Sequence, residues 1–282
     1  MPRKRNVVRK NRCRPQEDAR VRSSTGEKRL RRAGTREAVL AAFLVSSPVL
    51  AAPPYRTDDP EPTDYQHFEL YAHSTGVDVS GDANGFAPGV EIDYGVMPNT
   101  QLSIIAPLAF DRAAGEPSHW GYGDTEIGLK YRLIEQDANG WRPTIAIFPT
   151  VDIPTGNVRR GLGTGGARIF QPVWFQKDIG DWTINAGGGY SIKFGLGNKN
   201  DWFVGWLVQR KISDQLKIGA EIFHQTAVAV GRKESTGFNI GAIYDFTDAY
   251  HLVASVGRGL QNAKETNQFS WYLGFEVTGA WP

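Results

Sequence analysis

The stretch Glu126-Ile127-Gly128-Leu129-Lys130-Tyr131-Arg132-Leu133 alternates polar or glycine positions with apolar ones. A period of two is that of a β-strand, because successive side chains of a strand point to opposite faces. Here one face would hold Ile127 and Leu129, and the other would hold charged Lys130. A wall with lipid on one side and water on the other needs this division. The stretch therefore predicts a membrane-crossing strand.

The same alternation recurs in about twelve segments between Tyr65 and Val277, with no segment of helical period among them. The predicted strands lie at about 65–74, 90–96, 101–110, 122–133, 142–153, 168–177, 182–191, 202–211, 216–222, 238–245, 251–256 and 269–277. Two of them, 168–177 and 202–211, carry aromatic residues on both faces, so their facing stays open.

The connections between these strands alternate in length. Short turns are expected near Pro98, 135–140, 178–180, Asp214 and Asp248, and longer loops at about 76–85, 111–121, 154–166, 194–200, 226–235 and 259–267. Short turns on one rim and longer loops on the other are typical of outer-membrane barrels. We therefore predict an all-β fold over residues 65–282, a transmembrane antiparallel up-and-down β-barrel of about 12 strands.

The first part of the chain has a different composition. Residues 1–36 contain fourteen Lys or Arg, and an apolar run over 38–45 leads to the small-residue site Val49-Leu50-Ala51. This order is that of a secretory signal peptide. We predict that residues 1–51 are a basic preface plus a signal peptide; the translation start within residues 1–38 stays open. A helical membrane anchor is the alternative, but the run is too short to cross about 30 Å of hydrocarbon.

Removal of that segment reverses the charge balance of the chain. Fourteen of the 32 basic residues and four of the 30 acidic residues precede Ala52, which leaves 18 basic against 26 acidic residues. A net charge near −8 argues against a nucleic-acid partner. The single cysteine, Cys13, also lies in the predicted leader, so we expect no disulfide in the exported protein.

The polar faces of the predicted strands supply the candidate site residues, which we expect to line the lumen as a network of opposite charges. These lumen candidates are His67, Glu69, Glu91, Asp93, Glu126, Lys130, Arg132, Arg142, Asp152, Lys217 and Glu221. Arg159 and Arg160 are candidates in an outer loop, where they would steer anions, meet lipopolysaccharide phosphates or simply be solvated. The lumen of a twelve-strand barrel is narrow, and we expect it to be partly plugged by loop 154–166 or by segment 52–64.

Three other kinds of site receive little support. Gly161–Gly166 matches the G-x-G-x-x-G pattern but lies in a predicted loop that leads into a strand, whereas a dinucleotide fold needs a preceding strand and a following helix. His73 and Ser74 are neighbours that point to opposite faces of a strand, so they cannot readily form a catalytic pair. Paired inward carboxylates such as Glu91 and Asp93 could bind Ca²⁺ or act as acid and base, but we favour a lumen network in which they pair with inward Lys and Arg. No run of metal-ligand spacing is present in the sequence, and we expect no catalytic residues, metal or cofactor.

Several strings resemble one known family. They are Thr57–Pro62, Gly121–Arg132 with its Gly-Tyr-Gly-Asp start, and Phe148–Gly156 with its Pro-Thr-Gly end. Together they resemble the outer-membrane proteins grouped as the MetA-pathway-of-phenol-degradation family. The resemblance implies a transporter-type barrel for small, often hydrophobic or aromatic compounds, and it carries over no binding or catalytic residue.

We therefore expect a porin-like channel for passive uptake or export of small molecules in the outer membrane of a Gram-negative bacterium. Its expected partners are outer-membrane lipid, lipopolysaccharide, the solute and, during biogenesis, the barrel-assembly machinery. Two alternatives stay open: an outer-membrane lipid hydrolase, and a structural barrel that transports nothing. The sequence leaves the solute and the oligomeric state undefined.

Overall fold

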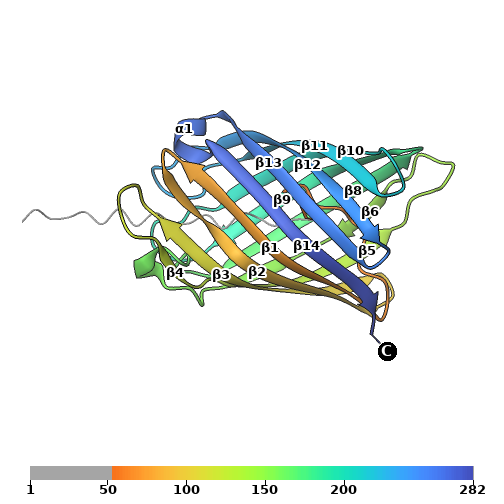
Figure 1. Cartoon of the computed structure of the whole chain (residues 1–282), viewed down its shortest axis with the longest axis horizontal. Helices are drawn as coiled ribbons and strands as arrows, with labels where there is room; N and C mark the ends of the chain where they lie inside the picture. Colours follow the sequence, from red (N-terminus) through yellow and green to blue (C-terminus); the bar gives the residue numbers. More distant parts are fainter. Residues whose placement is uncertain (1–52, 282) are drawn as a thin grey trace, which may run out of the picture. The chain divides into compact units, whose positions relative to one another are not determined.

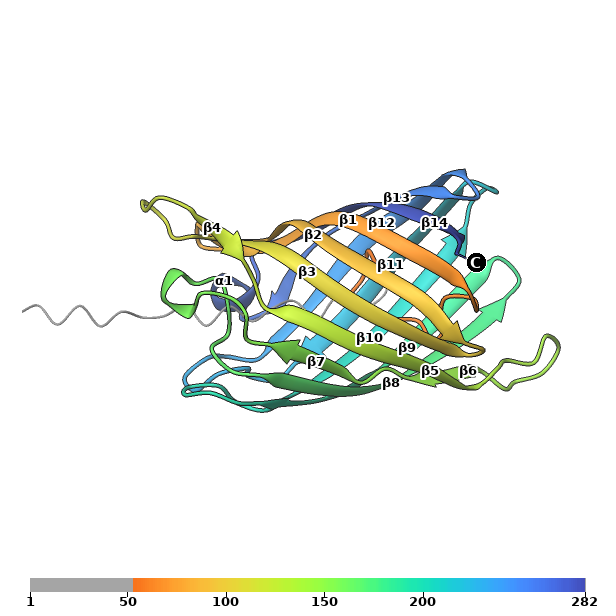
Figure 2. The same ribbon diagram turned by 90° about the horizontal axis from the view of Figure 1, so that it is seen from below.

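The computed structural model describes residues 53–281, and these form a single closed β-sheet (Figures 1 and 2). The predicted leader, residues 1–51, lies outside the described residues. The strands are β1 (His67–Val79), β2 (Asp82–Met97), β3 (Thr100–Arg112), β4 (His119–Tyr122), β5 (Thr125–Ile134), β6 (Thr144–Ile147), β7 (Thr150–Ile153), β8 (Arg168–Ile179), β9 (Trp182–Lys193), β10 (Asp201–Lys211), β11 (Leu216–Gln225), β12 (Ser235–Thr247), β13 (Tyr250–Gln261) and β14 (Phe269–Ala280). Two short helices, η1 (Val158–Arg160) and α1 (Ala263–Thr266), lie in loops.

The fourteen strand segments form a barrel of twelve strands, because two of these strands are each divided into two segments. β4 and β5 continue each other along β3, and β6 and β7 continue each other between β5 and β8. Every neighbouring pair is antiparallel, and β1 pairs with β14 from His67–Ala280 to Asp78–Phe269. The ring therefore has no free edge, which satisfies the backbone hydrogen bonds that lipid cannot satisfy. The prediction of a twelve-strand antiparallel barrel is confirmed.

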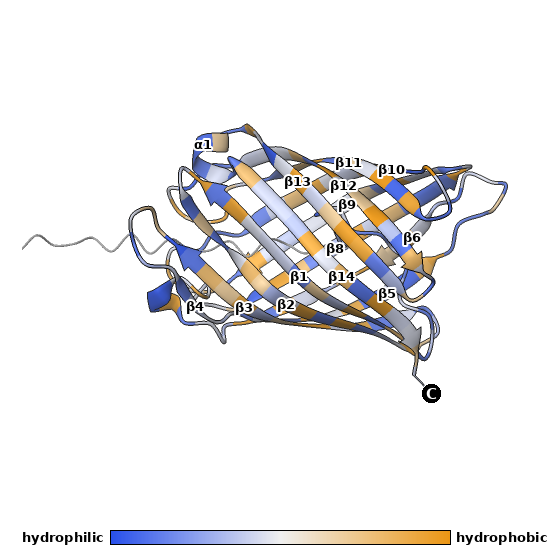
Figure 3. Cartoon of the chain, viewed as in Figure 1, coloured by the Kyte–Doolittle hydropathy of each residue, from blue (hydrophilic) through white to orange (hydrophobic). Residues whose placement is uncertain are grey.

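Hydrophilic and hydrophobic residues alternate along the strands (Figure 3), and the outward-facing residues are the apolar ones, as the alternation predicted. On β5, Leu129 and Tyr131 are 45% and 43% exposed, whereas Lys130 between them is 5% exposed. Ile92 on β2 and Leu273 on β14 likewise face outward, at 48% and 53%. No helix among residues 53–281 has the length and apolar character needed to cross a membrane.

The two rims differ as predicted, with two corrections. The connection expected as a short turn at 135–140 extends over residues 135–143, between β5 and β6. Both chain ends of the barrel and the short turns share one rim, here named the turn rim, and the longer loops lie at the other, named the loop rim. The expected loop at 76–85 is wrong, because β1 and β2 continue to a two-residue turn at Ser80 and Gly81. Both turn residues have positive φ, 58° and 94°, which suits a tight hairpin. Strand ends that extend beyond lipid need no apolar alternation, so their polar sequence resembles a loop.

The structure shows which residues of β8 and β10, the strands predicted at 168–177 and 202–211, point into the barrel. Phe170 and Trp174 of β8 and Phe203 of β10 point inward, at 2%, 1% and 0% exposure, while Phe175 and Trp206 point outward. Together with Phe148 and Phe223, the inward rings form an aromatic cluster inside the barrel. Aromatic residues occupy both faces of these strands because the outer face meets lipid and the inner face packs against other aromatic side chains rather than against water.

Candidate functional site

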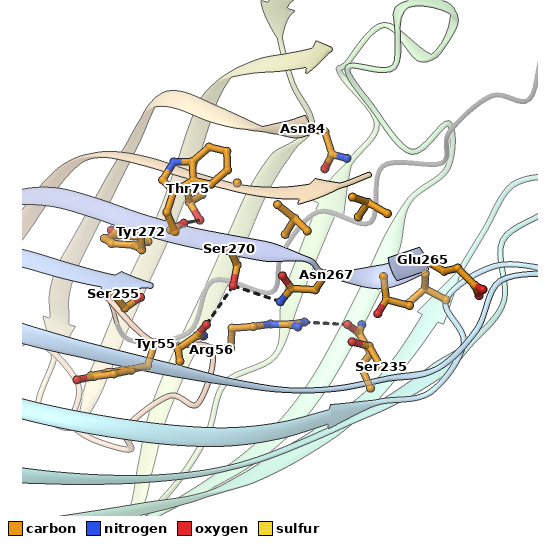
Figure 4. Close-up of a pocket in the computed structure, with 18 of the residues that line it drawn as sticks. Tyr55, Arg56, Thr75, Asn84, Ser235, Ser255, Glu265, Asn267, Ser270 and Tyr272 are labelled. Carbon is orange, nitrogen blue, oxygen red and sulfur yellow. Dashed lines mark hydrogen bonds between the residues drawn. The ribbon is translucent and has the colours of Figure 1, made fainter. Parts of the chain in front are cut away.

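Residues 53–64, which precede β1, lie inside the barrel, and we call them the lumen segment. Its first contacts are with β11 to β13. Ser255 of β13 donates to the carbonyl of Pro54, and Tyr55 lies over Gly219 and Gly241. A Cβ on Gly219 would lie 2.6 Å from the Tyr55 hydroxyl, so the missing side chain makes room for this ring. Figure 4 shows Tyr55 and Arg56 among the side chains of this part of the interior.

The centre of the lumen segment is held by one carboxylate. Glu221 of β11 accepts hydrogen bonds from the backbone amides of Arg56 and Thr57 at 2.9 and 2.8 Å. It also accepts from the Thr57 hydroxyl at 2.7 Å and from the Asn239 amide at 2.6 Å. Thr57 is fully buried over Gly205, where a Cβ would come within 2.2 Å of its hydroxyl oxygen. A carboxylate with four donors is well compensated for its removal from water.

Arg56 lies beside the aromatic cluster. Its guanidinium carbon is 4.4 Å from the centre of the Phe223 ring and 5.0 Å from that of Phe203, and it donates to Gln225 at 2.8 Å. Burial lowers the pKa of Arg56 to about 10, so it stays protonated at neutral pH. Gln225 in turn donates to Asp201, which pairs with Lys193 at 2.7 Å. The lumen segment is thus joined to a polar network that continues toward the loop rim.

The second half of the lumen segment reaches the opposite wall. Lys130 of β5 lies 3.1 Å from Asp58 and 3.6 Å from Asp59, with its ammonium 5.0 Å from the centre of the Phe148 ring. Burial raises the pKa of Asp58 to about 6, although the Lys130 ammonium acts in the opposite direction. Arg132 pairs with Glu61. The backbone amide of Thr63 donates to Gln101 of β3 at 2.8 Å. Residues 53–64 therefore cross the interior from β11–β13 to β3–β6.

Loop 154–167 also folds inward, from the loop rim. Asp124, in the break between β4 and β5, accepts from the backbone amides of Gly156 and Thr164 at 2.9 and 2.7 Å. This holds the loop so that Leu162, 3% exposed, packs with Phe86 and Ala109 of the inner wall. The string Gly161–Gly166 leads from this loop into β8 and is followed by no helix, so the structure gives it no dinucleotide fold.

The other predicted lumen residues occupy several positions. Glu126 and Asp152 both bind Arg168 of β8, at 2.8 and 2.6 Å. Glu69, Glu91 and Asp93 lie together on the inner face of β1 and β2. Lys217 is half-buried in the inward register of β11.

Four of the candidate residues lie away from the lumen. His67 is exposed at the turn rim, and its Nδ1 lies 3.1 Å from the carbonyl oxygen of Tyr65. Arg142 is not part of the wall, because it lies in the turn before β6, exposed and paired with Asp137. Arg159 and Arg160 are exposed on η1 in loop 154–167.

Of the residues that hold the lumen segment, sequence reasoning named Lys130, Arg132 and Glu221 as lumen candidates. It did not find Arg168, Gln101 or Asn239. The available signal was the set of inward glycines, Gly205, Gly219 and Gly241, each on a separate strand. Their lack of side chains marks where another chain segment approaches the wall.

Two cavities flank the lumen segment. The outer cavity, of about 150 Å³, lies toward the loop rim (Figure 4). Polar and aromatic groups line it, including Asn239, Ser270, Trp271 and Tyr272. The inner cavity, of about 160 Å³, lies toward the turn rim, between the lumen segment and the wall of β1, β2 and β3. The interior is therefore narrowed but keeps space on both sides of the crossing segment.

A closed antiparallel ring with an apolar outer band and a charged interior defines an outer-membrane β-barrel. The chain belongs to the family described as "Putative MetA-pathway of phenol degradation", whose model matches residues 55–276. The predicted family membership is confirmed.

Solved structures of the same kind resemble this barrel. An outer membrane channel from Pseudomonas putida F1 is 16% identical with a TM-score of 0.60, covering 78% of this chain and 99% of that one. The KdgM porin is 9% identical with a TM-score of 0.52, covering 74% and 98%, and the NanC porin is 9% identical with a TM-score of 0.51, covering 75% and 98%. At these identities the likeness establishes the fold. A search of curated proteins found no match.

Proposed function

We propose that the protein is a passive channel for small molecules across the outer membrane, and that the lumen segment narrows its pore. One observation carries the proposal: a closed wall surrounds a polar interior that keeps a cavity on each side of the crossing segment. A structural barrel has no need of such spaces, since packed side chains would fill them at lower cost.

The contacts of the lumen segment explain how it limits passage. Glu221 and Lys130 hold it from opposite walls, and the aromatic cluster fills the side of β8, β10 and β11. Solutes would move by diffusion through the remaining polar space. The family description and the rings of Trp271 and Tyr272 at the outer cavity support small aromatic compounds as candidate solutes.

The histidines with hydrogen bonds have partners other than serine. His251 bonds with Asp245 at 2.6 Å and His224 with Thr236 at 2.9 Å. Among residues 53–281, no histidine forms a hydrogen bond with a serine, so the Ser–His pair of a hydrolase is not assembled there.

Liposome swelling tests the proposal. Vesicles containing the folded barrel should swell in phenols, aromatic acids or small sugars faster than protein-free vesicles, with rates that fall as solute size rises. A matched sample containing heat-unfolded protein is the control. Swelling that never exceeds the protein-free rate for any solute would overturn the channel and favour a purely structural barrel.

A further inference from the structure

The wall formed by β1, β2 and β14 meets the lumen segment only at the segment's last residues. Most hydrogen bonds and ion pairs of the lumen segment go to β3, β5, β6, β11 and β13. Its last residues also meet the other wall, where Thr63 bonds with Glu69 of β1 and Asp64 lies against Gly95 of β2. Both cavities reach the other wall: the outer one through Thr75 and Tyr272, the inner one through Tyr71 and Glu91. His73 lies between Tyr71 and Thr75 on the inner face of β1. Each of the two cavities therefore borders this wall, one toward each rim.

Polar atoms on this wall lack partners. Both ring nitrogens of His73, the Tyr272 hydroxyl, one oxygen of Glu91 and one of Asp93 are buried without a hydrogen bond in the structure. The His73 and Tyr272 rings stack at 5.0 Å, and a Cβ on Gly89 would come within 2.4 Å of the His73 ring. Buried polar groups left without partners cost about 1–3 kcal/mol each. Of these residues, Tyr272 lines the outer cavity and Glu91 and Asp93 line the inner one, where water or a solute can supply the partner.

The ionisable groups that line the inner cavity are mostly acidic. Six carboxylates line it (Asp58, Asp59, Glu61, Glu69, Glu91 and Asp93), against the single ammonium of Lys130. Lys130 is held by Asp58 and Asp59, and Glu61 pairs with Arg132. Within residues 53–281, Glu69, Glu91 and Asp93 form no ion pair.

The geometry of these three acids disfavours an empty site. Glu69 and Asp93 are direct cross-strand partners, and like charges in that position are destabilising. Glu91 and Asp93 are 6% and 4% exposed, yet each presents an oxygen without a donor. A cation that passes through the cavity would supply both the charge and the N–H donors or electrostatic contact that the protein does not.

We propose that Glu69, Glu91 and Asp93 form a cation-selective filter at the inner cavity, through which potassium-sized cations and small primary amines pass in preference to anions. This inference rests on the proposed channel function. Rings of Asp and Glu select cations in other pores by the same electrostatics. No group of three acids or histidines in the described residues converges closely enough to hold a metal ion, which suits a mobile cation rather than a chelated one.

The zero-current potential of the folded barrel in a planar bilayer, under a gradient of KCl, tests the filter. The wild-type protein should favour K⁺ over Cl⁻ by roughly threefold or more, since a narrow acidic site concentrates cations. The double variant Glu91→Gln, Asp93→Asn should move the ratio toward equality, and each single variant should lie between. Ethylammonium chloride in place of KCl should show the same order.

The matched control is Asp214→Asn, Asp248→Asn, which removes two exposed carboxylates from turns of the same rim. It should leave the ratio unchanged. The heat-dependent gel mobility of folded barrels verifies that each variant is folded. A measurable current without cation preference, or an equal effect of the control, overturns the filter and leaves the channel standing. Absence of current in both the wild type and a variant that lacks the lumen segment removes the channel and the filter together.

Discussion

Glu221 shows how a single residue can position a whole segment. Its two oxygens bind two backbone amides, a hydroxyl and a side-chain amide, and three of these four donors belong to Arg56 and Thr57. Backbone amides inside a barrel need acceptors as much as those of the strands do. The carboxylate therefore fixes the height at which the lumen segment crosses.

Replacement of Glu221 by alanine should release the centre of the lumen segment. Hydrogen bonds to a buried carboxylate are worth about 1.5–3 kcal/mol each, so docking should weaken by about 3 kcal/mol. Amide hydrogen exchange read by mass spectrometry should show roughly hundredfold faster exchange over residues 53–64. Glu135→Ala, in an exposed turn, is the control. Unchanged protection in Glu221→Ala would show that this carboxylate does not hold the segment.

At the scale of the strand, β8 and β10 differ from the alternating strands because they face a packed region. Trp174 and Phe203 meet at 6.3 Å inside the barrel, edge to face. Outward Trp206 of β10 is 56% exposed and available to lipid. Trp174 therefore packs in the close-packed interior, whereas Trp206 contacts the fluid lipid outside the barrel.

Trp174→Ala should therefore cost more stability than Trp206→Ala. A truncated interior tryptophan loses apolar contact and leaves a cavity, for about 3–5 kcal/mol, whereas lipid chains fill the space outside. In urea unfolding from lipid vesicles, we expect the loss for Trp206→Ala to be smaller by about 2 kcal/mol. Equal losses for the two variants would contradict the assigned facing of β8 and β10.

The elements also show what sequence reasoning can reach. Strands such as β5 were predictable because lipid enforces the alternation of Leu129, Lys130 and Tyr131. The β1–β2 hairpin was missed because nothing enforces that pattern beyond the bilayer. The facing of β8 and β10 and the path of the lumen segment depend on contacts between distant residues, such as Lys130 with Asp58, and no local pattern encodes them.

At the scale of the whole molecule, the barrel combines a rigid wall with a removable obstruction. The strand ladder closes through β1 and β14 and does not depend on residues 53–63. The lumen segment is held in place by side-chain contacts with the wall. Two of the wall residues that make these contacts, Lys130 and Glu221, are buried and ionisable. The wall should therefore survive without the segment that narrows it.

Single-channel conductance with and without residues 54–63 tests this account most directly. Because the segment crosses the lumen from β13 to β3, its removal should raise the conductance severalfold while the folded gel mobility persists. A deletion variant that folds normally and conducts no better than the full-length barrel would contradict the claim that this segment narrows the pore.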